Sequence, residues 1–447
     1  MKKAFLFLCC ASFAAMSGLM CSCSSDDETG EDPQIPTPNA VKETNVNNDG
    51  EAYAPASGFD KTFNSNATYQ ELAGKTDFAV ALTKKVGGMK KNFVVSPLSI
   101  QMAFAMLANG AEEDTYKEIT ETVGMEGLDR NQLREYARLM IEHYVTDNST
   151  SISAGKSTPT EVLQIANSVW ADYTLPLYKT YLTSSKSYFS AETYSIDFNA
   201  DDATQAVNGW VNEKTNGKIP RVVDDISNTV ALLINTVYMK ASWTEAFESE
   251  NNVKSNFRNS DGTARECEML HATRYLKYCA GDKYDVASLD LGNLTYTMNF
   301  ILPHEDTDAE TVLNGMDAET LGEVAKGMKG TYLDIEIPKF KVTSDLDMME
   351  TMREMGIKAA FDANTADFSA MSPASLVVNR VKHNTYIDVN EEGVEAAAAT
   401  TIGLIGSTLE GDKPKAIDFH IDRPFLFTIQ DAKTGAVIFA GRVMDME

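Results

Sequence analysis

The sequence predicts a single large domain of the α+β class. Segments with helical spacing come mostly early in the chain, and segments rich in β-branched and aromatic residues dominate its second half. The chain has 447 residues, of which 43% are hydrophobic, and one polar stretch near the N-terminus is its only evident linker. The length would also suit two or three average domains, but the uniform composition favours one domain over residues 59–447.

Four segments are predicted to be helices from their apolar spacing and their end signals. Residues 69–86 stop at two glycines, and Ser96 followed by Pro97 is an N-cap that opens a helix over residues 98–108. The third segment is 203–215. The fourth segment carries an apolar stripe, which is more typical of a core than of a cofactor site, at Leu346, Met349, Met352 and Met355, before Gly356.

Strands are predicted where β-branched and aromatic residues concentrate between turn signals. These segments are 229–240, 296–303, 332–342, 376–389, 425–429 and 436–443.

A run of small residues, 391–400, connects two of these strand-like segments. Four consecutive alanines after Glu391, Glu392 and Glu395 are typical of a short surface helix, because alanine is the best helix former. However, helical spacing gives the run no apolar stripe, and residues 400–403 offer no clear C-cap. The run is therefore interpreted as a segment able to be loop, helix or strand, which suggests a switch.

The N-terminus has the pattern of a bacterial secretory signal. Two lysines precede the apolar residues 4–15, and small residues lead to Cys23, which fits a lipoprotein processing site better than Cys21 does. Residues 1–22 are thus predicted to be a lipoprotein signal peptide and Cys23 to carry lipid. An ordinary secretory signal is the alternative.

Residues 23–58 are predicted to be a flexible acidic tether, since they contain almost no large apolar side chain. Residues 24–28 resemble the acidic signal that sends some lipoproteins to the outer face of the outer membrane, so that face is the expected location, with secretion or the periplasm as alternatives. Loss of residues 1–22 removes two lysines and no acid, and the formal charge falls from -26 to -28. This charge argues against nucleic acid or anionic lipid as a partner and leaves the lipid anchor as the only membrane attachment.

Neither a metal site nor a cofactor site is expected. The five histidines are scattered without metal-ligand spacing, and no phosphate-binding loop is present. Two cysteines remain after Cys23, namely Cys267 and Cys279, and the sequence leaves open whether they form a disulfide. The glycines around Ser407 lack the spacing of a hydrolase nucleophile, so an enzyme is not expected.

Five motifs, in order along the chain, resemble the signatures of the serpin family. They are residues 92–99, 235–243, 337–340, 391–400 and 423–427, and the resemblance extends from about residue 70 to the C-terminus. It implies a fold of three β-sheets and eight or nine helices, with an exposed reactive-centre loop at about residues 391–415.

The resemblance also implies a function. A serpin offers its loop to a protease, and after cleavage the loop enters the central sheet as a new strand and distorts the trapped enzyme. The chain is accordingly expected to be a monomeric, extracellular suicide substrate of serine endopeptidases, and of papain-like cysteine proteases as a second class. The alternative is a non-inhibitory serpin that acts as a binding module.

In this comparison the run of small residues becomes the hinge of the loop. Its members are Glu391, Gly393, Val394, Glu395, Ala396, Ala397, Ala398, Ala399 and Thr400. An inserted strand places alternate side chains on opposite faces, and Val394 shares its parity with residues that are all small or apolar. Glu395 has the other parity and would face solvent, while Gly393 permits the bend where insertion starts.

Other residues take roles from the resemblance alone. Ser96, Ser99, Asn235 and His383 match a polar cluster under the strands that must part. Trp243 matches a tryptophan where insertion begins, and Lys339 and Glu391 match an ion pair at the top of the sheet. Taken singly, a histidine or tryptophan in such a segment is more often a core residue.

The family's usual spacing places the scissile bond between Ser407 and Thr408, which implies an elastase-like or subtilisin-like protease. The interval from Gly393 to Pro424 is longer than in a well-known member, so Leu404, Leu409 and Lys413 are alternative cleavage positions.

Overall fold

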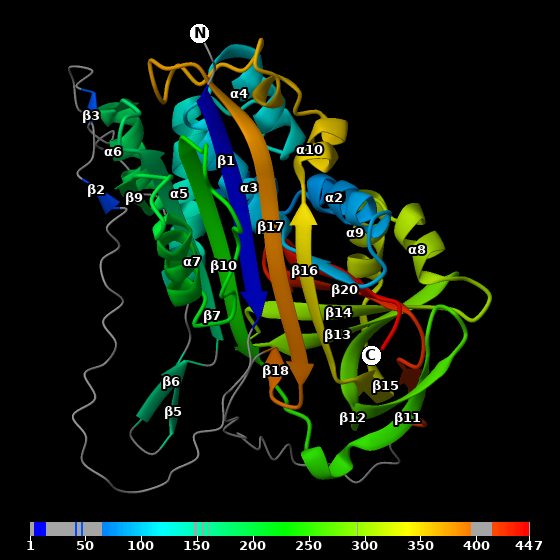
Figure 1. Ribbon diagram of the computed structural model, residues 1–447. Coiled ribbons are helices and arrows are strands. Elements are labelled where there is room, and N and C mark those ends of the chain that lie inside the picture. The colour runs from blue at the N-terminus through cyan, green and yellow to red at the C-terminus, as the bar shows by residue number, and fades with distance from the viewer. Residues whose placement is uncertain are drawn as a thin grey trace, which may run out of the picture.

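The protein is built from two large β-sheets and the helices that pack on them, as seen in a computed structural model (Figure 1). The structure describes residues 4–14, 41–42, 46–47, 65–146, 150–153, 156–159, 161–292, 294–394 and 414–446.

The first sheet has eight strands and includes Gly393 and Val394 of the predicted hinge. Its order is β1-β17-β18-β10-β7-β9-β2, with β1 also paired to β10 and β16 paired to β17. The strands are β1 (Ala4–Ala14), β2 (Val41–Lys42), β7 (Glu161–Asp172), β9 (Ala191–Ile196), β10 (Ala231–Ser242), β16 (Phe340–Asp347), β17 (Leu376–Asn390) and β18 (Gly393–Val394).

The second sheet has nine strands in the order β19-β15-β12-β13-β14-β20-β21-β4, with β11 paired to β12. They are β4 (Phe93–Val95), β11 (Val253–Arg258), β12 (Ala264–Ala280), β13 (Tyr284–Leu291), β14 (Tyr296–Pro303), β15 (Lys329–Pro338), β19 (Ile417–His420), β20 (Phe425–Asp431) and β21 (Val437–Val443). Two small ribbons complete the described strands: β3 (Val46–Asn47) with β8 (Leu177–Tyr178), and β5 (Thr150–Ser153) with β6 (Lys156–Pro159).

The expected three sheets are thus two large sheets and two ribbons in the described part of the chain. The 17-residue strand β12 explains the difference. It pairs with β15 over Met269–Tyr278 but with β13 only over Lys277–Ala280, so one long strand joins two groups of strands into a single hydrogen-bonded path.

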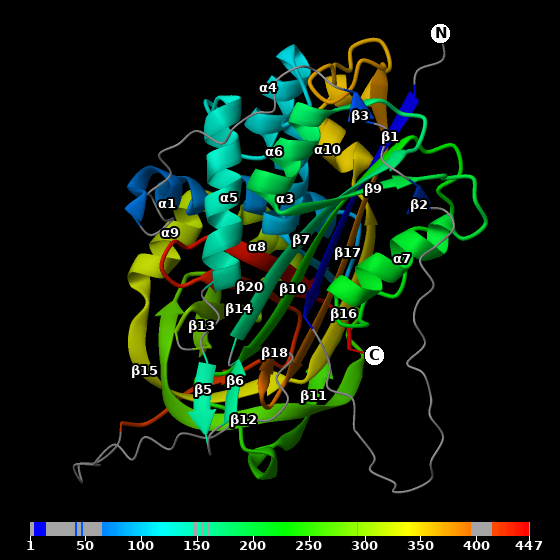
Figure 2. The ribbon, with the colours of Figure 1, turned by 90° about the vertical axis from the view of Figure 1, so that its left-hand side faces the viewer.

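Ten α-helices lie in the described residues, where eight or nine were expected. They are α1 (Ala67–Ala73), α2 (Asp77–Gly87), α3 (Pro97–Ala108), α4 (Glu113–Thr122), α5 (Arg130–Thr146), α6 (Lys179–Phe189), α7 (Ala203–Lys214), α8 (Ala309–Gly315), α9 (Ala318–Gly327) and α10 (Met349–Met355). Figure 2 shows α7 on one side of the first sheet, with α3 and α5 on the other side. Helix α3 contacts both β10 and β21, and this position between the sheets accounts for its nearly complete burial.

The helix predictions hold in part. The predicted helix over residues 69–86 is wrong at its middle, where it divides into α1 and α2. A side-chain carbon at Gly74 would lie 2.5 Å from the Thr434 carbonyl oxygen, so the chain at this break passes close to another segment. Helices α3 and α7 are confirmed, and the Ser96 hydroxyl accepts a 3.2 Å hydrogen bond from the amide of Ser99.

The predicted strand over residues 332–342 is also divided, at Lys339, into β15 and β16, which belong to different sheets. The Lys339 amide donates to the Glu268 carbonyl, which continues the register of β15 with β12 by one residue before the chain crosses to the first sheet. Leu346 lies at the end of β16, and the predicted methionine-rich helix starts only at Met349. The other predicted strands are confirmed within a few residues as β10, β14, β17, β20 and β21.

The two remaining cysteines are both free thiols. Cys267 and Cys279 lie twelve positions apart on the same strand, β12, which at about 3.3 Å per residue separates them by roughly 40 Å. A disulfide needs α-carbons within about 7 Å, so the disulfide alternative is wrong. Among the described helices, none has the length and apolar character needed to cross a membrane.

Candidate functional site

The candidate site is the space between β10 and β17, here called the slot. β18 lies at one end of it, antiparallel to both neighbours: Val394 is opposite Ala241 and Val389, and Gly393 is opposite Ser242 and Asn390. β1 fills the rest of the slot and runs parallel to both strands, opposite residues 231–239 of β10 and 376–386 of β17 (Figure 1). β1 and β18 therefore follow one another in a single strand position.

The tight return from β17 into β18 depends on Gly393. This residue has a φ of +145°, and a Cβ atom on it would lie 2.2 Å from the Ala241 carbonyl oxygen. Both the positive φ and the closeness of the Ala241 backbone exclude any residue other than glycine at this position. The Asn390 side chain supports the turn by accepting a 2.9 Å hydrogen bond from the Glu392 amide.

Val394 is fully buried, with an exposed fraction of 0%. In β18 its side chain thus lies on the inner face of the sheet. The rest of the predicted hinge, Glu395, Ala396, Ala397, Ala398, Ala399 and Thr400, lies outside the described residues, as do Ser407, Thr408 and Cys23. For these positions the sequence-based assignments stay predictions.

Trp243 lies directly beside this turn. Its indole N–H donates a 2.9 Å hydrogen bond to the Asn390 carbonyl, and its backbone amide donates to the Glu392 carbonyl at 2.9 Å. Its ring meets Phe247 edge to face at 6.1 Å, and the Phe247 amide donates to the Glu391 carbonyl. The predicted tryptophan therefore binds the turn into the hinge, with its side chain on Asn390 and its backbone on Glu392.

The predicted ion pair is present at the same end of the slot. Lys339 Nζ lies 2.9 Å from a Glu391 carboxylate oxygen and 3.3 Å from one of Glu268. Asn252, which sequence reasoning missed, donates to the same Glu391 oxygen at 2.7 Å. Nothing in the sequence near Asn252 signals this contact, because it depends on the fold of a distant segment.

These contacts shift both members of the pair toward their charged forms. Burial acts to raise the pKa of Glu391, but the hydrogen bonds from Lys339 and Asn252 outweigh it and lower that pKa. Burial likewise acts to lower the pKa of Lys339, but the hydrogen bond with Glu391 outweighs it and raises that pKa. The pair is therefore charged over the whole neutral range.

The predicted polar cluster is assembled beneath the slot. His383 on β17 accepts a 3.1 Å hydrogen bond at Nε2 from the Ser96 amide, and the Ser99 hydroxyl donates to Asn235 Oδ1 at 2.7 Å. Asn235 continues the chain by donating to Asn167 on β7 at 2.8 Å. All of these side chains are essentially excluded from solvent.

The cluster thus links α3 to three strands of the first sheet, and it brings Ser96, Ser99, Asn235 and His383 together. Sequence reasoning missed Asn167, which donates onward to the Phe189 carbonyl at 2.6 Å. The sequence offers little signal for it, because Gln164 and Ser168 also stand among the apolar residues of the run 163–171.

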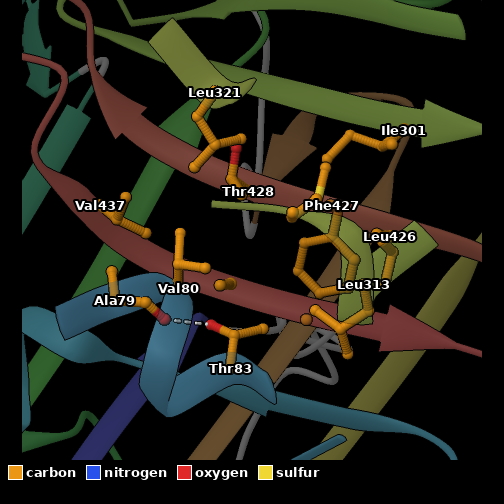
Figure 3. A pocket seen from close by; sticks show the side chains of 13 residues that line it. Ala79, Val80, Thr83, Ile301, Leu313, Leu321, Leu426, Phe427, Thr428 and Val437 are labelled. Carbon is orange, nitrogen blue, oxygen red and sulfur yellow. Dashed lines mark hydrogen bonds between the residues drawn. The ribbon is translucent and has the colours of Figure 1, made fainter. Parts of the chain in front are cut away.

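A separate apolar cavity lies between α2, α8 and the strands β14, β20 and β21 (Figure 3). Its lining includes Val80, Leu313, Leu426, Phe427 and Val437. The cavity volume is about 30 Å³. Small-molecule sites usually measure about 300–1,000 Å³, so this cavity cannot hold such a ligand without widening.

Comparison with known proteins gives one consistent result. The family described as "Serpin (serine protease inhibitor)" matches residues 73–446. Among curated proteins, Iripin-2 of Ixodes ricinus is 30% identical over 363 residues, which are 80% of this chain and 88% of that protein. Human Serpin B3 is 28% identical over 372 residues, which are 79% of this chain and 93% of that protein.

Solved structures agree with this result. The thermophilic serpin tengpin in its native state has a TM-score of 0.74 at 26% identity, and the match covers 90% of this chain and 97% of tengpin. Human thyroxine-binding globulin, solved in complex with its hormone, also has a TM-score of 0.74, at 25% identity and with 85% and 98% of the two chains covered.

Proposed function

Because the chain belongs to the serpin family, whose members are generally protease inhibitors, we propose that it traps serine endopeptidases as a single-use substrate. One observation carries the proposal. Two of the hinge residues, Gly393 and Val394, already form a strand in the slot, antiparallel to both β10 and β17. A cleaved loop has only to extend a strand that has begun.

The register of β18 tells which neighbours each further hinge residue would meet. Continued by two residues, it sets Ala396 opposite Met239 and Ile387, both of which are fully buried. Such a position accepts only a small or apolar side chain, because burying a charge without a partner is strongly unfavourable. The alanine run meets this requirement.

The same register sets Thr400 between Asn235 and His383, two members of the buried polar cluster. A hydroxyl at this position can exchange hydrogen bonds with that cluster, whereas a bulky apolar residue cannot. Glu395, with the opposite parity, would lie between Lys240 and Asp388, so one neighbour favours its charge and the other opposes it. The inward positions Ala396 and Thr400 therefore suit insertion, whereas Glu395 gains no clear advantage from it.

Insertion requires that β1 leave the slot. We propose that export removes residues 1–22 and with them β1, so that the mature protein carries an open strand position beyond Val394. Lipid attached to Cys23 would then hold the protein at the outer face of the outer membrane, where it meets extracellular proteases. Labelling with a radioactive fatty acid tests this anchor, and a Cys23→Ala variant that still incorporated label would exclude it.

The target proposed is an elastase-like or subtilisin-like protease that cleaves between Ser407 and Thr408, with papain-like cysteine proteases as a second class. Small side chains at this bond suit enzymes with small specificity pockets. In the proposed mechanism the protease forms its acyl-enzyme with the loop, and insertion then carries it along the sheet. No catalytic group of this chain takes part.

The test is incubation of the purified protein with pancreatic elastase, subtilisin and papain in turn. A stable inhibitory complex appears as an adduct that survives SDS, and mass spectrometry of the released C-terminal peptide identifies the bond. Cleavage of the loop without any adduct would contradict the proposal. That outcome would favour the non-inhibitory alternative, a binding module.

A further inference from the structure

We propose that a divalent transition metal ion, with zinc as the best fit, binds on the outer face of the second sheet where β15 meets β19. The site consists of Asp334 on β15 with Asp418 and His420 on β19, here called the edge cluster. One donor atom from each of the three side chains lies within 4.8 Å of the other two.

Strand register brings the edge cluster together. β15 and β19 are parallel, with Asp334 opposite Asp418 and Glu336 opposite His420. Residues two apart on a strand share a face, so the four side chains project from the same side of the sheet. The alternating residues Leu333 and Ile335 are fully buried, which identifies the face of the edge cluster as the outer one.

A second histidine supports the cluster from the neighbouring strand. His271 on β12 lies with Nε2 2.8 Å from a carboxylate oxygen of Asp334. A carboxylate held by a histidine in this way is fixed in orientation, as are the hydrogen-bonded carboxylates around protein-bound metals.

His420 supplies the observation that points to a ligand. Its side chain is 37% exposed, but its Nε2 atom is shielded from solvent and has no hydrogen-bond partner in the part of the chain that the structure describes. The nearest carboxylate, Glu336, lies 4.0 Å away, which is beyond hydrogen-bond distance. A ring nitrogen left without a partner beside two carboxylates is a ready donor for a metal ion.

The donor set selects the class of metal. Imidazole nitrogen with carboxylate oxygen suits zinc and its neighbours in the first transition row, whereas magnesium and calcium prefer oxygen alone. Zinc bonds to such donors measure about 2.0–2.2 Å, so tetrahedral ligand atoms lie roughly 3.3 Å apart. Asp418 is exposed, and rotation of its side chain can close the remaining distance.

The ion would fasten β19 to β15. β19 has only four residues, forms the edge of the sheet and begins shortly after the reactive-centre loop. Its pairing with β15 consists of the four residue pairs from Ile417 to His420. A metal bridge between the strands would resist separation of β19 at the C-terminal end of the loop.

Zinc chloride alone, titrated into the purified protein and followed by calorimetry, tests the site. We expect one saturable site, with affinity at least about tenfold weaker in His420→Ala and in Asp418→Asn. His304→Ala is the matched control, because His304 forms a similar pair with Asp285 at 3.1 Å and belongs to no three-residue group of donors among the described residues. Hydrogen exchange of residues 417–420 should slow with zinc in the wild type but not in His420→Ala.

The exposed Asp418→Asn variant keeps the test valid if His420→Ala fails to fold. Absence of saturable zinc binding would overturn the proposal, as would equal affinity in the wild type and both ligand variants. A loss in His304→Ala as large as that in His420→Ala would overturn it too. None of these measurements involves a protease, so their outcome is separate from that of the proposed inhibition.

Discussion

The indole of Trp243 donates a 2.9 Å hydrogen bond to the carbonyl oxygen of Asn390, the last residue of β17 before the chain turns into β18. The Trp243 side chain, which directly follows β10, thus binds the end of β17 at the point where the hinge enters the slot. Together with the backbone bond from Trp243 to Glu392, it fixes the first turn of the hinge from outside.

Replacing Trp243 with phenylalanine should loosen this turn. The variant keeps an aromatic ring but leaves the Asn390 carbonyl without its indole donor, and an unsatisfied buried group costs about 1–3 kcal/mol. Urea unfolding should show a loss of that order, and hydrogen exchange of residues 391–394 should accelerate. Trp170→Phe is the matched control, since the Trp170 indole donates to Ser168 at 2.8 Å on β7. It should lose stability without faster exchange at the hinge.

Gly393→Ala should drive β18 out of the slot. The added methyl group would overlap backbone atoms of Ala241 and Ser242, which cannot move without shifting β10, and a φ of +145° adds strain of about 1–3 kcal/mol. We expect faster hydrogen exchange at residues 391–394. Gly262→Ala is the comparison, because Gly262 also has a positive φ but open space at its Cβ position. Unchanged exchange in Gly393→Ala would mean that β18 does not depend on the glycine.

Asn235→Ala should weaken the attachment of α3 beneath the slot. It removes the partners of both the Ser99 hydroxyl and the Asn167 side chain, and each buried group left unsatisfied costs about 1–3 kcal/mol. The thermal unfolding midpoint should fall clearly. Asn299→Ala removes two comparable side-chain bonds at a half-buried position and should have a much smaller effect. An equal fall of the unfolding midpoint in Asn235→Ala and Asn299→Ala would show that the effect does not depend on burial of the cluster.

The sequence was most informative where a residue type stands out from its own segment. Ser96 before Pro97 is a local capping signal, and small residues from Gly393 onward conflict with the strand-rich surroundings, so both were found without a structure. His383 and Asn235 are identified by their motifs, and the structure places both in one buried polar cluster.

Features that depend on register between distant strands could not be predicted. The edge cluster joins residues more than 80 positions apart, and only the parallel pairing of β15 with β19 brings Asp334 to Asp418. The break at Lys339 was missed for the same reason, since β15 and β16 follow each other directly but join different sheets. Periodicity shows which residues form a strand and not which strand is its neighbour.

The Lys339–Glu391 pair should give the hinge a pH dependence with two limits. The pKa of Glu391 is lowered in the folded protein. Its contribution to stability is therefore complete above the ordinary glutamate pKa of about 4.3, and it disappears as the pH falls through the pKa that Glu391 has in the folded protein. Because the pKa of Lys339 is raised, its contribution is complete below about 10.4 and disappears as the pH rises through the folded value.

A double-mutant cycle with Lys339→Met and Glu391→Gln measures this coupling. We expect a coupling free energy of up to about 1 kcal/mol between pH 5 and 9, which is roughly the interval between the ordinary pKa values of glutamate and lysine. The coupling should decline outside this interval. The pair Lys254 and Glu266, at 3.3 Å and largely exposed, is the control and should show almost no coupling. A coupling that stayed constant down to pH 2 would contradict the assignment of the decline to Glu391.

Val394→Arg should convert the proposed inhibitor into an ordinary substrate. Val394 is fully buried between Val389 and Ala241, and an arginine there would place an unpaired charge at the first inserted position. Cleavage of the loop by elastase should continue, because the protease meets residues beyond the hinge, but the cut loop should not enter the slot. On a denaturing gel the SDS-resistant adduct should be absent, and cleaved protein and free protease should appear in its place.

Val394→Ala is the matched control for this change. Alanine keeps the position small and apolar, as it already is at the next inward residue, Ala396, so this variant should still form the adduct. The comparison separates insertion from recognition, because both variants leave residues 401–413 unaltered. If Val394→Arg trapped protease in the same ratio as Val394→Ala, entry at Val394 would not be the step that makes the inhibitor, and the slot would have to fill from another point.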